Sequence, residues 1–126
     1  MGSAAIPERV RRLILDAIDS VAELEALLLL RETPDQAWTI DAASARLYVS
    51  QTVAAYSLRA LARRGFIEEA AQGFRYGPAS TELAEDVAAL AVAYSGNLIA
   101  VTQLIHGKPG PSVQDFARAF RLRKDS

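Results

Sequence analysis

The chain has 126 residues, enough for one domain, and hydrophobic residues make up 51% of it, enough for a buried core. It contains no cysteine and one histidine, which excludes disulfides, thiolate zinc sites and a thiol nucleophile and argues against a protein zinc site of the usual kind. Lys and Arg number 14 against 15 Asp and Glu, so the net charge of −1 does not by itself indicate a nucleic-acid partner.

The first predicted helix begins near Ile6-Pro7-Glu8, because proline and an acidic residue are both favoured in a first helical turn. Apolar residues then recur at helical spacing: Val10, Leu13, Ile14, Ala17 and Ile18. We assign residues 1–19 to this N-terminal helix. The N-terminal segment MGSAAIPERVRR lacks the apolar core of a signal peptide, and we expect a cytoplasmic protein.

A second helix is predicted from Ser20-Val21-Ala22-Glu23, which fits the capping box. In this motif the serine side chain accepts from one free amide and the glutamate reaches back to another. The helix runs to about Arg31, and Pro34-Asp35 marks the turn after it. Trp38-Thr39-Ile40 then reads as a short extended segment, from which Thr39 or Asp41 caps a third helix of about two turns.

Ser50 is predicted to cap a fourth helix that ends at Gly65, where a left-handed backbone favours glycine. Ala54, Leu58 and Leu61 follow at i, i+4 and i+7, which predicts its buried face. Short strands at 66–69 and 74–77, joined by a glycine-containing turn, predict a β-hairpin after it.

A long helix follows the hairpin, capped by Ser80 or Thr81, and we assign residues 80–106 to it. Ser95-Gly96-Asn97 inside it predicts a kink or a notch for close helix packing. The apolar run 87–105 approaches membrane-spanning length, but the polar residues within it favour a buried helix, and we expect no membrane contact.

This helix is apolar on nearly every face, so it must be covered on more than one side. The rest of the domain covers one side, the N-terminal helix can cover more, and a second subunit can supply the rest. We therefore expect a homodimer, with an interface at Leu90, Tyr94, Leu98 and Val101. The alternative is that the helix binds a different protein.

Residues 107–126 form a Gly/Pro linker and a short amphipathic tail, in which Val113, Phe116, Ala117 and Phe120 share one helical stripe. We expect Phe116 and Phe120 to dock on the protein's own dimer. Two alternatives stay open: the tail docks on a partner protein, or it is a basic arm near DNA.

No catalytic pattern stands out, since the chain has no G-x-S-x-G, phosphate loop or glycine-rich cofactor turn. His106 ends the long helix and is interpreted as a capping residue. The acidic residues Asp16, Asp19, Glu23 and Glu25 are interpreted as solvated surface and capping groups. We predict no enzyme, no metal site and no cofactor.

Residues 20–79 follow the order helix, short strand, helix, turn, helix, hairpin. Leu58-x-x-Leu61-x-x-x-Gly65-Phe66-Ile67 resembles the end of the recognition helix in bacterial winged helix-turn-helix regulators of the MarR and ArsR type. WTIDAASARL (38–47) and FRYGPAS (74–80) are similar to the start of their supporting helix and the return strand of their wing. The opening IPERVRR also resembles uncharacterised bacterial winged-helix proteins, which implies no activity. The resemblance implies a mainly α winged-helix domain with extra N- and C-terminal helices, acting as a DNA-binding transcriptional regulator.

The face of the fourth helix opposite its buried stripe supplies the recognition candidates Gln51, Thr52, Tyr56, Arg59 and Arg63. Glutamine can read adenine, and arginine can read guanine or bind phosphate. Arg64 and, in the hairpin, Arg75 are expected to contact the DNA backbone.

Each of these predictions has an alternative. Arg63 and Arg64 also suit a solvated helix end that the helix dipole stabilises, and Tyr56 also suits a protein contact. Glu68 and Glu69 beside the hairpin would repel phosphate. The alternative function is therefore a winged-helix protein-interaction module that does not bind DNA.

Overall fold

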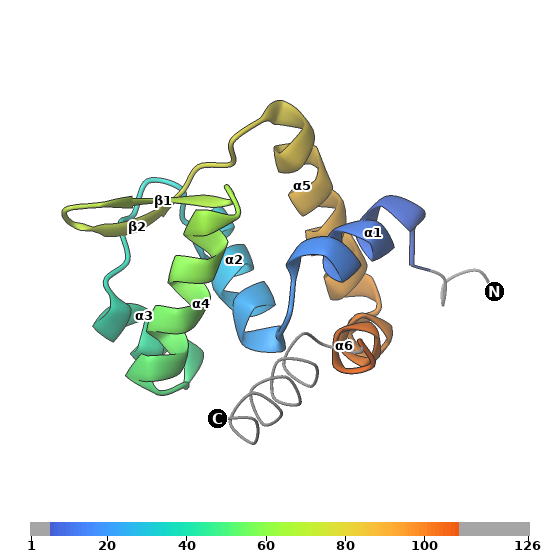
Figure 1. Cartoon of the computed structure of the whole chain (residues 1–126), viewed down its shortest axis with the longest axis horizontal. Helices are drawn as coiled ribbons and strands as arrows, with labels where there is room; N and C mark the ends of the chain where they lie inside the picture. Colours follow the sequence, from blue (N-terminus) through green and yellow to red (C-terminus); the bar gives the residue numbers. More distant parts are fainter. Residues whose placement is uncertain (1–5, 109–126) are drawn as a thin grey trace, which may run out of the picture.

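The computed structural model describes residues 6–108, which form six helices and a two-stranded antiparallel hairpin (Figure 1). In chain order these are α1 (Glu8–Ala17), α2 (Val21–Glu32), α3 (Ile40–Leu47), α4 (Gln51–Arg63), β1 (Ile67–Ala70), β2 (Gly73–Tyr76), α5 (Thr81–Gly96) and α6 (Leu98–His106). The predicted mainly α fold with a small hairpin is confirmed. The predicted tail residues Phe116 and Phe120 lie outside the described part of the chain.

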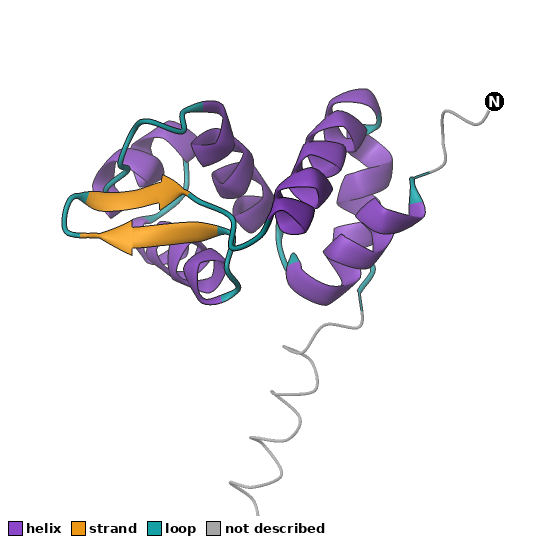
Figure 2. Ribbon diagram, turned by 90° about the horizontal axis from the view of Figure 1, so that it is seen from above, coloured by secondary structure: helices purple, strands orange, loops and turns teal. Residues whose placement is uncertain are grey.

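The elements pack as two groups that lie side by side (Figures 1 and 2). The hairpin group consists of α2, α3, α4, β1 and β2, and the helical group of α1, α5 and α6. The helix predicted for the N-terminus therefore packs against the helices at the other end of the described chain. One continuous hydrophobic core joins the groups, with Ile14 and Ile18 from one and Leu24 and Leu27 from the other, all 0% exposed.

Local signals in the sequence set four of the helix starts. Ser20, Thr39, Ser50 and Ser80 each accept a hydrogen bond from the backbone amide three residues on, at 3.0–3.1 Å. This bond satisfies one of the amides that a helix start leaves without an intrahelical partner. The predicted caps are confirmed, with Thr39 rather than Asp41 and Ser80 rather than Thr81.

Trp38 forms a short extended segment that pairs with the hairpin. It forms an isolated antiparallel bridge to Phe74, with N–O distances of 2.7 and 2.8 Å in the two directions. Trp38 is buried, with 7% of its surface exposed, and its indole Nε1 donates a hydrogen bond to Thr33 Oγ1 at 2.9 Å. The polar atom of the buried ring is therefore bonded. Gly73 permits this approach, because its φ is +133° and an added Cβ would lie 2.4 Å from Trp38 O.

The single long helix predicted for residues 80–106 is wrong, because the chain breaks at Asn97. α5 and α6 are bent by 113° at this residue, whose φ of −152° is not helical. A Cβ added at Gly96 would meet nothing within 4 Å, so the segment is a kink and not a packing notch. Folding α6 back brings both helices onto α1, which covers apolar surface that one straight helix would expose.

Between residues 6 and 108, no single helix is long and apolar enough to cross a membrane. α5 and α6 reach that length and composition only as a pair, across their sharp bend.

Candidate nucleic-acid interface

One face of α4 lies in the core and the opposite face is open. Ala54, Leu58 and Leu61 are at most 1% exposed, which confirms the predicted buried stripe. The exposed side chains of α4 include all five predicted recognition residues: Gln51, Thr52, Tyr56, Arg59 and Arg63. Tyr56 is 66% exposed. α4 therefore presents an amide, a hydroxyl, an aromatic ring and two guanidinium groups on one accessible helix.

Local hydrogen bonds and backbone geometry fix both ends of α4. Tyr48 takes a left-handed backbone (φ 60°) after α3, and Ser44 Oγ donates to Val49 O at 2.7 Å in the same turn. Ser50 then caps the helix. Gly65 ends it with a φ of 86°, a region that L side chains rarely adopt. The exposed face of α4 thus has a defined orientation relative to α3 and the hairpin.

Arg75 lies on the exposed face of the hairpin with an acidic neighbour. The strand register places Glu68 directly opposite Arg75, and Glu69 opposite the buried Phe74 on the other face. The Glu68 carboxyl group lies over Gly77, where an added Cβ would be 2.8 Å from Glu68 Cδ. Cross-strand neighbours of opposite charge attract each other, so Glu68 reduces the positive potential that Arg75 presents.

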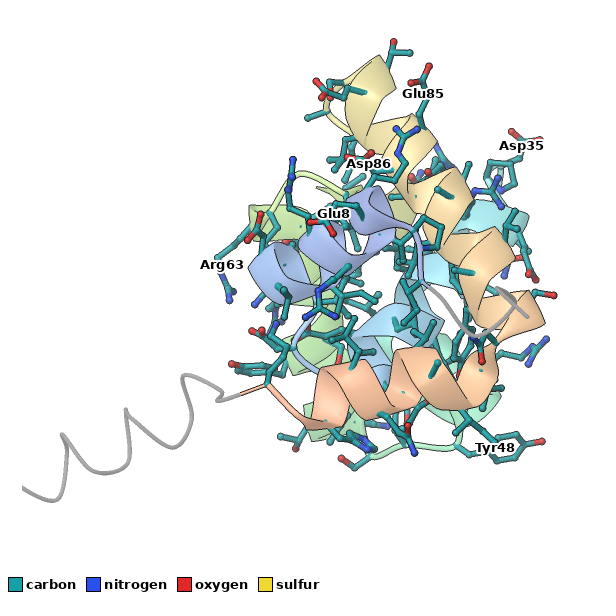
Figure 3. The ribbon with its side chains drawn as sticks, turned by 90° about the vertical axis from the view of Figure 1, so that its right-hand side faces the viewer. Glu8, Asp35, Tyr48, Arg63, Glu85 and Asp86 are labelled. Carbon is teal, nitrogen blue, oxygen red and sulfur yellow. The ribbon has the colours of Figure 1, made fainter. Side chains whose placement is uncertain are left out.

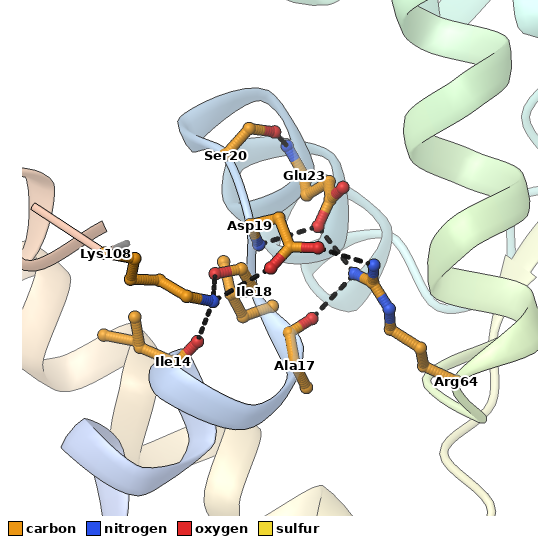
Figure 4. Close-up of polar contacts among 8 residues, drawn as sticks. All are labelled: Ile14, Ala17, Ile18, Asp19, Ser20, Glu23, Arg64 and Lys108. Carbon is orange, nitrogen blue, oxygen red and sulfur yellow. Dashed lines mark hydrogen bonds and ion pairs between the residues drawn. The ribbon is translucent and has the colours of Figure 1, made fainter. Parts of the chain in front are cut away.

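Arg64, predicted to contact the DNA backbone, is instead bound inside the chain (Figure 4). Its Nη1 donates to Glu23 Oε1 at 2.7 Å and to Ala17 O at 2.8 Å, and its Nη2 donates to Asp19 Oδ2 at 2.9 Å. We correct this prediction and leave Arg64 out of the interface, because its guanidinium is already ion-paired with two carboxylates. The interpretation of Glu23 as solvated is also wrong, since its side chain is 1% exposed.

Lys108 completes this arrangement from the far end of the described chain (Figure 4). Its Nζ donates to Ile14 O and Ile18 O at 2.8 Å each and to Asp19 Oδ1 at 2.9 Å. The carbonyl groups at the end of a helix are only partly hydrogen-bonded within it, so Lys108 and Arg64, which bind Ile14 O, Ala17 O and Ile18 O, together act as the C-terminal cap of α1. The hydrogen bond from Lys108, and then the charges of Lys108 and Arg64, lower the pKa of Asp19 against the effect of its partial burial.

We call Asp19, Glu23, Arg64 and Lys108 the junction network. It joins the α1–α2 connection, the end of α4 and the end of α6, so it ties the helical group to the hairpin group. Sequence reasoning missed it because its ion pairs join residues 41 to 89 positions apart. Within residues 6–108 no group of three or more His, Asp or Glu side chains could hold a metal ion.

The four residues predicted for a dimer interface fall in different environments. Leu90 and Val101 are 0% exposed, because they pack in the chain's own core, and neither can contact a second copy. Tyr94 is half-buried and donates to Glu25 Oε2 at 3.0 Å. Leu98 is 54% exposed, and two other exposed aliphatic residues, Val92 (73%) and Ile99 (67%), lie within six positions of it in the sequence.

A groove of about 380 Å³ lies where α2, the end of α3 and the end of α5 meet. Leu28, Leu29 and Leu47 supply its aliphatic lining, and Tyr48 and Tyr94 its aromatic residues. Glu25, Glu32 and Arg46 are its charged residues. Burial, followed by the hydrogen bond to Glu25, raises the pKa of Tyr94.

A second hollow, of about 450 Å³, lies between α1 and α5. The ion pair of Arg9 with Asp86, at 2.7 Å, lies along it. Its lining is strongly charged with both signs, which suits an ion-paired helix contact better than a ligand site.

No protein-family model, curated protein or solved structure matches the chain.

Proposed function

We propose that the protein is a winged helix-turn-helix DNA-binding transcriptional regulator that acts as a homodimer. The observation that carries this proposal is the open face of α4, where the recognition candidates stand on a helix fixed at both ends. A recognition helix reads DNA with its N-terminal residues in the major groove. In this chain Gln51 and Thr52 would take that position, and Tyr56 and Arg59 would follow them.

The cationic groups of this interface are Arg59, Arg63 and Arg75. Arg59 and Arg63 are exposed on α4, and Arg75 is exposed on the hairpin that follows it. With Arg64 bound internally and Glu68 opposite Arg75, the interface has fewer available charges than its arginine content suggests. We therefore expect salt-dependent binding of modest strength and modest salt slope, since counterion release scales with the number of phosphates contacted.

The test is a titration of a labelled duplex, followed by fluorescence anisotropy at low salt. Replacing Arg59 and Arg63 together with alanine should weaken binding at least about tenfold and reduce the salt slope by about 2 for each subunit, or about 4 for the dimer, because each group contributes one phosphate contact per subunit. The matched control replaces Arg11 and Arg12, two exposed arginines of α1, and removes the same charge from the helical group.

Equal weakening in the two double variants would mean that net charge, and not the face of α4, controls binding. Absence of duplex binding even at about 50 mM salt would reject the proposal, because non-specific DNA affinity is largest there.

Of the four residues predicted for the dimer interface we keep Leu98, and we place the dimer contact at the elbow patch, defined as Val92, Leu98 and Ile99. These three residues are 54–73% exposed and flank the break between α5 and α6. Residues 87–105 contain no Asp, Glu, Lys or Arg, although charged residues make up 23% of the chain. Depletion of charge is the compositional mark of an interface centre. A two-fold dimer could present two α4 helices about 34 Å apart, one turn of DNA.

Light scattering tests this surface. The wild-type protein should show twice the chain mass of 13.6 kDa, and Ile99→Glu should shift it towards the single chain, because it places an unpaired charge in the contact. Leu15→Glu is the control, since Leu15 is an exposed aliphatic residue (43%) on α1 of the same group. A dimer that survives Ile99→Glu would contradict the placement.

The second candidate function is a winged-helix protein-interaction module that does not bind DNA. The elbow patch and the compensated charges of Arg64 and Arg75 favour it. The same anisotropy titration separates the two functions, because this candidate requires no duplex affinity at low salt.

A further inference from the structure

The groove between α2, α3 and α5 has the chemistry of a site for an amphipathic segment. Its floor is aliphatic, with Leu28 from α2 and Leu47 from α3 both half-buried. Glu25 and Glu32 are exposed and stand seven residues apart, or about two turns, on α2. A helix with apolar anchors and nearby basic residues fits such a surface.

Tyr48 contributes an aromatic ring to this groove from the left-handed C-terminal cap of α3. It is the one non-glycine residue of 6–108 with a positive φ, and its ring is 92% exposed. A left-handed backbone at a tyrosine is destabilising, and an exposed ring contributes no burial energy that would offset this. Figure 3 labels Tyr48 and Arg63 at opposite sides of the molecule, so Tyr48 does not extend the α4 face around Arg63. Tyrosine is a frequent anchor where a partner segment binds.

The tail of the same chain has the complementary pattern. Phe116 and Phe120 are four residues apart, the spacing of one helical face, and Arg121, Arg123 and Lys124 follow them closely. Residues 109–126 carry four basic and two acidic residues, a net charge of +2. The groove carries two acidic residues and one basic residue, Arg46. The opposite net charges favour docking of the tail in the groove.

The length of the linker suits docking within one chain. Lys108 is held at the C-terminal end of α6, and Ser95, which lines the groove, lies just before the N-terminal end of that helix. The nine residues of α6 span about 13 Å at 1.5 Å per residue. Residues 109–112, which include two prolines, span up to about 13 Å when extended. A tail that turns back along α6 therefore reaches the groove as the stripe from Val113 to Phe120 begins.

We propose that residues 113–124 dock as an amphipathic helix in this groove of their own chain, with Phe116 and Phe120 on the aliphatic floor and Tyr48 closing over them. This contact is independent of DNA binding. It also accounts for an exposed tyrosine in a left-handed turn, whose ring becomes covered when the tail is bound.

Engineered disulfides test the docking in the full-length protein, because the natural chain has no cysteine. One variant pairs Ser95→Cys in the groove with Ala117→Cys in the tail stripe. The control pairs Gln103→Cys with the same Ala117→Cys, since Gln103 is exposed on α6 and closer to the tail in sequence. If the tail moves freely, the Gln103 pair, which closes the shorter loop, should oxidise at least as fast as the Ser95 pair. Docking should reverse this order, with the Ser95 pair oxidising at least about tenfold faster within one chain.

Two further variants identify the contacts. Tyr48→Asn keeps a residue that tolerates the left-handed backbone and removes the ring, so it should bring the Ser95 pair down to the rate of the Gln103 pair. Tyr56→Ala removes another exposed ring, on α4, and should leave the rate unchanged. The proposal is overturned if the Gln103 pair reacts as fast as the Ser95 pair, if Tyr48→Asn has no effect, or if the main product is a disulfide-linked dimer.

Discussion

Gly73→Ala should lower the free energy of unfolding by roughly 3 kcal/mol, because it combines a strained backbone with a steric clash. The φ of Gly73 is +133°, and the new Cβ would lie 2.4 Å from Trp38 O and 2.7 Å from Trp38 C. Both contacts are with backbone, which cannot rotate away as a side chain can. Relief requires Trp38 to separate from Phe74, which would break the bridge that holds the extended segment to the hairpin.

Urea unfolding followed by tryptophan fluorescence measures this effect, since Trp38 is the one tryptophan of the chain and is 7% exposed. Gly96→Ala is the matched control, because an added Cβ there meets nothing within 4 Å and alanine is the better helix former. We expect it to change stability by less than about 1 kcal/mol, in the stabilising direction. Equal stability of Gly73→Ala and the wild type would show that the contact between Gly73 and Trp38 is not required.

Arg64→Ala should cost about 3 kcal/mol of stability, because it leaves a carboxylate buried without its counter-charge. Glu23 is 1% exposed and receives the Arg64 guanidinium at 2.7 Å. After the substitution it keeps the hydrogen bond from Asp19 N at 3.0 Å, which offsets only part of the loss. Ala17 O also loses a donor, so one of the caps of α1 disappears.

Arg63→Ala is the control for Arg64→Ala, since it removes the same group one residue earlier from an exposed position. Its effect should stay within about 0.5 kcal/mol. Glu23→Gln combined with Arg64→Ala should recover part of the stability, because a neutral amide costs less to bury than a carboxylate. Thermal and urea unfolding of the wild type, Glu23→Gln, Arg64→Ala and the double variant give the coupling between the two residues. Equal costs for Arg63→Ala and Arg64→Ala would contradict a structural role for the junction network.

Local chemistry made several elements predictable. The caps at Ser20, Thr39, Ser50 and Ser80 each need only a side chain and the backbone amide three residues further on. A short sequence pattern is therefore enough to predict them. The buried stripe of α4 follows in the same way from helical spacing. The five recognition candidates on the opposite face of α4 are exposed, as predicted. The duplex titration tests whether they bind DNA.

The sequence predicted a kink or a packing notch at Ser95-Gly96-Asn97, but not that the helix ends there and the chain turns by 113°. Helical periodicity continues through Ser95-Gly96-Asn97, and an apolar surface on every side predicts burial without saying by what. The sequence suggested a second subunit, whereas the chain covers Leu90 and Val101 by folding α6 back onto α1. The direction of the bend decides which apolar residues stay exposed, and these residues form the elbow patch.

The sequence by itself determined where α2, α3, α4 and α5 begin, and which face of α4 is buried, because these features depend on residues within one or two turns of each other. Only the tertiary structure decided which charges are available. Arg63 and Arg64 are neighbours of the same type, yet the first is exposed and the second is bound to Glu23 and Asp19. The difference arises because a buried carboxylate more than 40 positions away requires a cation, and the fold brings only one of the two arginines within its reach.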